Sequence, residues 1–441
     1  MSGRNLFLTK ILWAIILTSI AANLAGAFAP ELGFDALWYH LTIPKLYFEA
    51  GRIFFVPGGL LYYSAMPRLA ETAYLAMFRL FGPETTAPHL LNWAAGVGAA
   101  AVTYKLARKL GLSSFFSLLS SLIFYVTPLV GWQSGSAYVD LIRTFFEILA
   151  LYLVVDKKLL FAALAAGLAV SVKTLALGSF LPLAAATYLV FGNLLSSLFF
   201  LLFYFTVAVP WFFSAWLSTG YPFYPLGSGI LDATHRLGLS AEYFPRQDLT
   251  SPFYILIFPF LGPVIRFRRF APLLAYCLIG FIVWYLTPHT GGGRFLLPYL
   301  PAMAVLAASV VSLWKNRFFT GALFGSFIVI AVFSLFYRVA AAKKLLPLFL
   351  GRETKTQYLC ANLDFKTAVF ADCDGWFAKN IKPTDLVLVD NSIHNLFYID
   401  FPFVHQSWYQ GQKVDYLLSR DARNLPLIYD NHQTGLKLYA L

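Results

Sequence analysis

Apolar runs long enough to cross a bilayer recur along most of this chain of 441 residues. A helix needs roughly 20 apolar residues, at 1.5 Å of rise each, to cross ~30 Å of hydrocarbon. The runs are continuous and do not alternate between apolar and polar residues, which favours helices over a membrane barrel. Only 12% of the residues are charged, against about 25% in an ordinary soluble domain. The sequence therefore predicts an all-α polytopic membrane bundle.

The hydropathy pattern predicts about eleven transmembrane helices. Two short segments, 159–174 and 176–192, decide the sidedness of every later span, because merging them would reverse it. The expected spans lie near residues 6–28, 88–105, 113–131, 137–155, 159–174, 176–192, 195–216, 252–265, 271–287, 294–312 and 319–337.

Lysine and arginine gather in the short loops between these spans. If the amino terminus is cytoplasmic, four inner loops carry the positive charge that is typical of cytoplasmic loops. The same pattern requires the two short spans to be separate. The net charge of +12 therefore reflects membrane topology, and we expect no nucleic-acid partner. The loop residues are Lys105, Arg108, Lys109, Lys157, Lys158, Arg266, Arg268, Arg269, Lys315 and Arg317.

In this topology two long loops, 29–87 and 217–251, lie outside the cytoplasm. The first contains two segments, 39–49 and 67–81, in which aromatic and charged residues interleave as they do in interfacial helices. The first span, 6–28, is too long for the apolar core of a cleaved signal peptide. We expect it to remain as an anchor in the cytoplasmic (inner) membrane.

The carboxyl-terminal part of the chain changes character, because Asp and Asn appear and the apolar runs shorten to strand length. We expect a transmembrane module over residues 1–340 and a small extracytoplasmic α/β domain over 341–441. Segments 385–390 and 396–399 are predicted strands of that domain.

Two of the three cysteines, Cys360 and Cys373, lie in this tail. An oxidising compartment can join them, and their spacing is not that of a metal site, so their pairing stays open. Cys277 lies within a span and is expected to be a buried thiol.

Ionisable residues at membrane depth are costly, so those present usually face a cavity or a partner. Asp35 lies at the outer end of the first span, where it fits either a water-facing carboxylate or a helix N-cap. Asp140 begins a later span at the same outer surface, so the two carboxylates can converge on one pocket. Arg143 and Glu147 share its helical face and are expected to neutralise each other inside the bundle.

Four further residues could bind an anion or a metal on this side. Lys173 ends a span, where a lysine commonly extends to the interface. Arg294 follows His289 and three glycines, a combination that favours an anion site but lacks phosphate-loop spacing. His40 fits a structural role, a metal ligand beside Asp35 or a hydrogen-bond donor to phosphate, and metal dependence stays open.

Five short motifs share this order and this side of the membrane. They are DALWYHLTIPK at 35–45, YVD at 138–140, SVKT at 171–174, TGYPFYPL at 219–226 and GRFLLP at 293–298. In these motifs the chain resembles the GT-C class of polytopic glycosyltransferases, the branch that contains protein O-mannosyltransferases and lipid A aminoarabinose transferases. The resemblance in layout covers about residues 1–340.

The sequence departs from that class at one point. Many members have two adjacent acidic residues in the first outer loop, whereas Ala36 follows Asp35 here. A second carboxylate, if the reaction needs one, must come from Glu49, Glu71 or Asp140.

The resemblance implies transfer of a hexosyl or pentosyl unit from a polyprenyl-phosphate donor to a lipid, glycan or protein acceptor outside the cytoplasm, with inversion. Such a reaction needs a base for the acceptor hydroxyl and cations for the phosphate leaving group. We expect Asp35 to be the base, with Asp140 orienting the acceptor or supporting the site. The phosphate would be held by Lys173, Arg294, His289 and His40, with support from Tyr39, Glu71 and Tyr138.

Two other functions fit parts of the sequence. A flippase or transporter of lipid-linked sugars needs polar groups near the bilayer midplane, and Arg143 and Glu147 favour it. A scaffold that displays the tail to a partner needs neither the outer carboxylates nor the cations. The glycosyltransferase is the interpretation that uses both.

Overall fold

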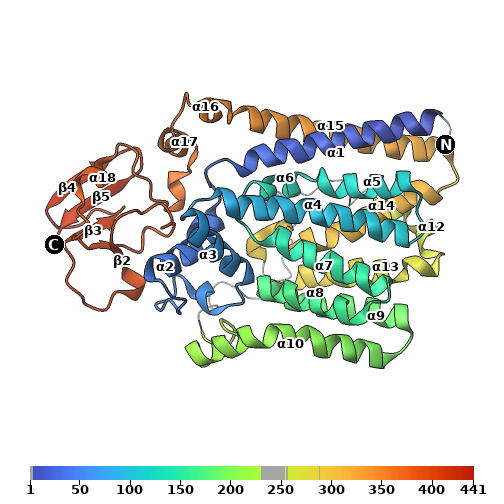
Figure 1. Cartoon of the computed structure of the whole chain (residues 1–441), viewed down its shortest axis with the longest axis horizontal. Coiled ribbons are helices and arrows are strands. Elements are labelled where there is room, and N and C mark those ends of the chain that lie inside the picture. The colour runs from blue at the N-terminus through green and yellow to red at the C-terminus, as the bar shows by residue number, and fades with distance from the viewer. Residues whose placement is uncertain (1–2, 230–253, 255–256, 288) are drawn as a thin grey trace.

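The computed structural model describes residues 3–229, 254, 257–287 and 289–441. It forms an elongated bundle of roughly parallel helices with a small sheet domain at one end (Figure 1). The predicted helical bundle with a small carboxyl-terminal sheet domain is therefore confirmed.

The centre of the bundle is α14 (Leu300–Leu313), whose apolar window is 83% buried. Two helices, α1 (Gly3–Ala27) and α15 (Arg317–Lys343), lie side by side along one edge of the bundle (Figure 1) and keep most of their apolar surface exposed. The other bundle helices are α4 (Thr86–Lys109), α5 (Ser114–Tyr125), α6 (Pro128–Ser134), α7 (Asp140–Val155), α8 (Leu159–Val172), α9 (Phe180–Phe191), α10 (Leu194–Thr219), α12 (Gly262–Ile265) and α13 (Ala271–Leu286), with the 3-10 turns η3 (Thr174–Ser179), η5 (Phe258–Phe260), η6 (Arg268–Phe270) and η7 (His289–Tyr299).

Within the described residues, six helices are long and apolar enough to cross a membrane. A seventh span results if α5 and α6 are counted as one, although their axes differ by 65°. The break divides the predicted span at 113–131 into two helices. Its cause is Pro128, which lacks an N–H and disfavours helical backbone at the preceding Thr127. The count of about eleven spans stays a prediction.

Segments 159–174 and 176–192 form separate helices, α8 and α9, as expected. The expected span at 252–265 is different. Where it is described, it consists of the turn η5 and the four-residue helix α12, because Pro259 and Pro263 interrupt regular helix there.

The first outer loop folds into short helices between the bundle and the tail (Figure 1). Both expected helical segments form: 39–49 is covered by a π-helical turn η1 (Ala36–His40) and α2 (Thr42–Ala50), and 67–81 contains α3 (Leu69–Phe81). A 3-10 turn, η2 (Tyr62–Ala65), lies between them.

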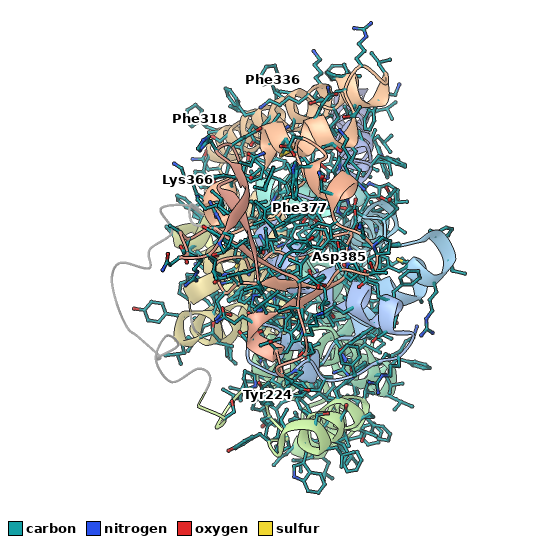
Figure 2. The ribbon with its side chains drawn as sticks, turned by 90° about the vertical axis from the view of Figure 1, so that its left-hand side faces the viewer. Tyr224, Phe318, Phe336, Lys366, Phe377 and Asp385 are labelled. Carbon is teal, nitrogen blue, oxygen red and sulfur yellow. A yellow bond between two sulfur atoms is a disulfide. The ribbon has the colours of Figure 1, made fainter. Side chains whose placement is uncertain are left out.

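The tail contains a five-stranded sheet with the order β2-β1-β3-β5-β4. Strand β1 pairs in parallel with β2 and β3, while β5 pairs antiparallel with β3 and β4. In Figure 2 the labelled tail residues Phe377 and Asp385 lie in front of the bundle, so the sheet domain covers one end of it. The elements are β1 (Val387–Val389), β2 (Phe403–His405), β3 (Tyr416–Ser419), β4 (Leu427–Asn431) and β5 (Leu436–Ala440), with α16 (Leu346–Phe349), α17 (Lys355–Asn362), η8 (Phe365–Thr367), α18 (Trp376–Asn380) and η9 (Gln406–Trp408).

The strand expected at 385–390 is β1, but the strand expected at 396–399 is wrong. That segment is a buried loop. Leu396 and Ile399 pack against the sheet, whereas Phe397 packs on the helices of the first outer loop. Its apolar pattern therefore arises from burial between two surfaces and not from pairing within the sheet.

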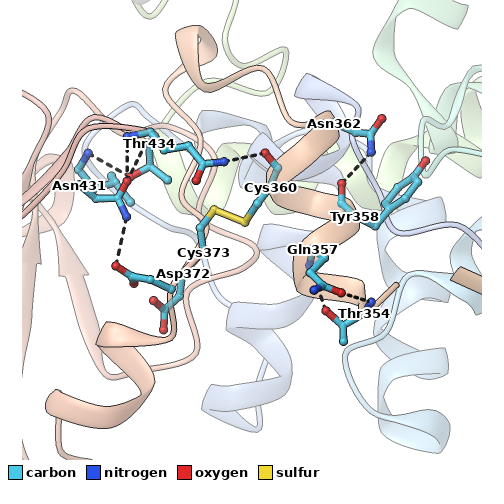
Figure 3. Close-up of a disulfide and its surroundings, with 12 residues drawn as sticks. Thr354, Gln357, Tyr358, Cys360, Asn362, Asp372, Cys373, Asn431 and Thr434 are labelled. Atoms are coloured by element: carbon cyan, nitrogen blue, oxygen red, sulfur yellow. Dashed lines mark hydrogen bonds between the residues drawn. A yellow bond between two sulfur atoms is a disulfide. The ribbon is translucent and has the colours of Figure 1, made fainter. Parts of the chain in front are cut away.

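A disulfide joins Cys360 of α17 to Cys373 (Figure 3), which settles the pairing that the sequence left open. Thr354 and Gln357 form a capping box at the start of the same helix. Cys277 is a buried free thiol in α13, as expected.

Candidate active site

Four charged residues from four distant segments form one ion-pair cluster. Arg294 Nη1 lies 2.7 Å from Asp35 Oδ2, and Arg294 Nε lies 3.6 Å from Asp140 Oδ2. Lys173 Nζ lies 2.7 Å from Asp140 Oδ1. The two carboxylates and two cations thus balance one another, with Arg294 as the bridge.

Asp140 is the buried member of the cluster, with a side chain only 1% exposed. It occupies the first turn of α7, where the helix dipole favours a carboxylate. One of its oxygens accepts a hydrogen bond from Lys173, and the other from Gln133 Nε2 at 3.3 Å. Both oxygens are therefore engaged within the protein, which suits an anchor for the two cations.

Asp35 is the accessible carboxylate, with a side chain 17% exposed. It precedes η1, but its side chain makes no capping hydrogen bond, so the N-cap interpretation is wrong. Tyr138 Oη accepts a hydrogen bond from the Asp35 backbone N–H at 3.1 Å, and Tyr39 Oη lies 3.4 Å from Asp35 Oδ2. Burial, together with the Asp35 charge, raises the pKa of Tyr39, so its hydroxyl remains a donor.

The two cations are held against aromatic rings. The guanidinium of Arg294 lies 4.8 Å from the Tyr138 ring centre, and Lys173 Nζ lies 5.1 Å from that of Phe295. Each cation side chain is 13% exposed. Arg294 Nε makes no hydrogen bond, which leaves one donor beside the cluster without an acceptor. The arrangement can accept an additional anion.

One of the expected phosphate ligands, His40, is not in this cluster. His40 Nδ1 lies 2.5 Å from Glu71 Oε1, and both side chains are buried. The His40 ring lies next to two residues that contact Asp35, because its centre is 4.1 Å from that of Tyr39, at a tilt of 45°, and 6.1 Å from that of Tyr138. The side chain of His289 lies outside the described residues.

A second buried network, absent from the sequence predictions, fixes the segment before Asp35. Glu31 accepts hydrogen bonds from the backbone N–H of Gly33 and of Ala137, both at 2.6 Å, and from Ser136 Oγ. His89 Nε2 lies 3.0 Å from Glu31 Oε2, the oxygen that Ala137 also contacts. Burial alone raises the pKa of Glu31, but the His89 and backbone hydrogen bonds bring it below its usual value.

Glu31 thus ties the segment that leads to Asp35 to the segment that leads to Asp140. The sequence offered one signal for this role, because Glu31 is a carboxylate at the membrane boundary, as Asp35 is. Nothing in the sequence indicated His89 or Ser136 as its partners.

The tail is joined to the same loop by polar contacts. Lys45 Nζ donates to the carbonyls of Phe397 at 2.9 Å and Ile399 at 2.5 Å, and it pairs with Asp400. Tyr398 Oη donates to the Glu31 carbonyl at 2.8 Å. The tail therefore contacts the loop that carries Asp35.

In the part of the chain that the structure describes, no group of three His, Cys, Asp or Glu side chains is arranged to hold a metal ion.

Comparison with solved structures finds the same fold in membrane glycosyltransferases of the GT-C class, so the fold that the five motifs predicted is confirmed. ArnT from Cupriavidus metallidurans bound to undecaprenyl phosphate superposes with a TM-score of 0.69 at 14% identity, over 100% of this chain and 98% of that one. Its apo state gives 0.67, with the same identity and coverage.

The archaeal oligosaccharyltransferase AglB from Archaeoglobus fulgidus, in complex with an inhibitory peptide and a dolichol-phosphate, gives a TM-score of 0.56 at 12% identity. The match covers 95% of this chain and 70% of AglB. No protein-family model matches the chain, and no curated protein does. At these identities the likeness concerns the fold.

Proposed function

We propose that this protein is a membrane glycosyltransferase that moves a sugar from a polyprenyl-phosphate donor to an acceptor outside the cytoplasm. The observation that carries the proposal is the cluster of Asp35, Asp140, Lys173 and Arg294, in which one carboxylate and both cations remain partly accessible. The ArnT and AglB structures, which share the fold, hold undecaprenyl phosphate and dolichol-phosphate. Their ligands support a lipid-linked donor here.

The chemistry assigns a role to each member of the cluster. The acceptor hydroxyl attacks the anomeric carbon while the bond from that carbon to the phosphate oxygen breaks. Asp35 takes the hydroxyl proton as general base. Lys173 and Arg294 stabilise the charge on the departing polyprenyl phosphate. A single displacement of this kind inverts the anomeric centre.

Asp35 is preferred to Asp140 as the base for a geometric reason. Both oxygens of Asp140 are engaged with Gln133 and Lys173, and its side chain is closed to solvent. Of the charged groups in the cluster, Asp35 contacts Arg294, and it does so through one carboxylate oxygen. A donor phosphate competes for that guanidinium, which frees Asp35 to accept a proton. Asp140 then acts as a positioning residue for the cations.

The proposed function also requires a particular membrane topology. The transmembrane module spans residues 1–340 with the amino terminus inside, and the domain 341–441 lies outside, in the cytoplasmic membrane. The disulfide between Cys360 and Cys373 supports an outer location of that domain, because disulfides persist in oxidising compartments. The contacts of Lys45 with the tail support a position of the tail domain over the candidate active site.

The transporter interpretation loses its main support. Arg143 Nε lies 2.6 Å from Glu147 Oε1, and Ser179 and Tyr276 donate to the other carboxylate oxygen of Glu147. The group is buried among α7, η3 and α13. Its polar atoms satisfy one another and serve the packing of the bundle.

The test is sugar transfer in proteoliposomes supplied with radiolabelled polyprenyl-phosphate sugars and a mixture of membrane and envelope acceptors. We expect a new glycoside from the wild-type protein and from Glu84→Gln, an exposed carboxylate of the same loop that pairs with Lys355. We expect loss of transfer in Asp35→Asn. Movement of labelled lipid between leaflets with no new glycoside would replace this proposal with the transporter.

A further inference from the structure

A cavity of about 540 Å³ lies beside the candidate active site, between α1, α6 and α15. Its wall includes Gly33, Phe34 and Tyr138, so it reaches the residues that flank Asp35. The Tyr138 ring borders the cavity and also carries the guanidinium of Arg294. The cavity and the ion-pair cluster therefore share one side chain as a wall, but the four charged residues do not line it.

A buried arginine with no acidic partner borders this cavity. Arg338 of α15 is 6% exposed and forms no ion pair with any described residue. Its Nη2 donates to the carbonyls of Tyr125 at 2.8 Å and Thr127 at 2.6 Å. Its Nε and Nη1 are buried without a hydrogen-bond partner.

Arg338 has a structural role that accounts for only one of its three nitrogens. Nη2 satisfies carbonyls at the break between α5 and α6, which Pro128 creates. A neutral amide donor could do the same. A positive charge that is buried in the membrane region without a counter-charge costs several kcal/mol. The remaining donors and the charge together call for an anion.

The carboxylate that lines this cavity forms no ion pair with Arg338. Glu31 lines the cavity as well, but hydrogen bonds from Gly33, Ser136 and Ala137 and the contact with His89 occupy its oxygens. Among the other polar residues in the wall, Asn23 has a side-chain Nδ2 that is also buried without a partner. Arg338 and Asn23 thus border one cavity with buried donors for which no described residue supplies an acceptor.

The cavity continues into an apolar groove on the lipid-facing edge of the bundle. A groove of about 310 Å³ runs between α1 and α15, and Ala22 and Ala342 line both spaces. Its walls are small or apolar, with Lys343 as the only charged residue among those that line it in the described chain. These two helices lie side by side at the edge of the bundle (Figure 1) and keep most of their apolar surface exposed.

We infer that this cavity binds one phosphate-bearing lipid of the bilayer, with the phosphate at Arg338 and an acyl chain in the groove between α1 and α15. Arginine recognises phosphate by charge-assisted hydrogen bonds. The combined spaces fall within the usual range of ligand pockets, about 300–1,000 Å³. The inference does not depend on the transfer reaction, since it rests on Arg338 and on residues outside the ion-pair cluster.

The test is native mass spectrometry of the purified full chain, titrated with phosphatidylglycerol, phosphatidylcholine or inorganic phosphate. We expect one retained phosphatidylglycerol, weaker retention of the zwitterionic lipid, and no displacement by millimolar inorganic phosphate. Arg338→Gln should weaken phosphatidylglycerol binding at least ~10-fold, which corresponds to about 1.4 kcal/mol. Arg317→Gln, the same change at the exposed start of α15, is the matched control.

A second variant covers the case in which Arg338→Gln fails to fold. Ala22→Phe fills the junction of the two spaces and leaves the hydrogen bonds of Arg338 to α5 and α6 intact. It should lose phosphatidylglycerol to the same extent. Unchanged binding in Ala22→Phe, equal retention of both lipids by the wild-type protein, or displacement by inorganic phosphate would each overturn the inference.

Discussion

The contrast between Asp35→Asn and Asp140→Asn tests the division of roles within the ion-pair cluster. Each change removes one negative charge from a group of two carboxylates and two cations. For Asp140, 1% exposed, the change leaves Lys173 and Arg294, each 13% exposed, beside a neutral amide. Breaking a buried ion pair costs about 3–5 kcal/mol. We therefore expect a marked loss of stability in Asp140→Asn.

For Asp35 the expected cost lies in the reaction and not in the fold. Its side chain is 17% exposed, and Arg294 keeps its contact with Asp140 after the change. Solvent-exposed ion pairs contribute about 0–1 kcal/mol to stability, so the partly exposed pair of Asp35 with Arg294 should contribute less than the buried pair of Asp140 with Lys173. Loss of a general base slows a reaction by about 10²–10⁴-fold, or roughly 3–5 kcal/mol of activation free energy.

The assay combines two measurements on each variant: the apparent melting temperature in detergent and the rate of sugar transfer in proteoliposomes. The control is Glu84→Gln, which should match the wild type in both. Asp35→Asn should keep the wild-type melting temperature and lose transfer. If it retained more than about a tenth of the wild-type rate, or if it melted as early as Asp140→Asn, the assignment of the base to Asp35 would be wrong.

Three further predictions concern the tail. Replacement of Cys360 and Cys373 by serine should destabilise the tail domain by about 3 kcal/mol, because the disulfide closes a loop of about 14 residues. Thermal unfolding with and without reductant measures this loss of stability, and equal midpoints would contradict the prediction. Burial lowers the pKa of His405 to about 4, below the unfolded value of about 6.5. Tail stability should therefore be complete above pH ~6.5 and fall by up to about 3 kcal/mol as the pH drops towards 4, while His405→Phe should lose this dependence in hydrogen exchange. Lys45→Met leaves two buried carbonyls of the tail without a donor, at a cost of about 1–3 kcal/mol. Proteolysis of the tail should therefore accelerate. The control is Lys366→Met at an exposed position, which should leave the rate of proteolysis unchanged.

The sequence alone was enough for features that depend on local composition. A helix that crosses a membrane must be apolar over its own length, so hydropathy located α1, α10, α13 and α15 to within a few residues. Charge at membrane depth is costly wherever it occurs, which singled out Asp35, Asp140, Lys173 and Arg294 one at a time. The five motifs, through their resemblance to the GT-C class, predicted the fold.

The sequence was misleading where a local pattern has more than one structural cause. Apolar residues at 396–399 resemble a strand, but they are buried between the sheet and the first-loop helices. The run at 113–131 resembles one span, although Pro128 bends it by 65°.

Tertiary structure alone decided which of the charged residues meet. Asp140 and Lys173 are 33 residues apart, and Lys45 contacts Asp400 across 355 residues. Such pairs form because a buried charge must find a partner in space, and sequence distance places no limit on where that partner lies. For the same reason the bonds from Glu31 to Ser136 and Ala137, and the uncompensated charge of Arg338, became visible only once the helices were packed.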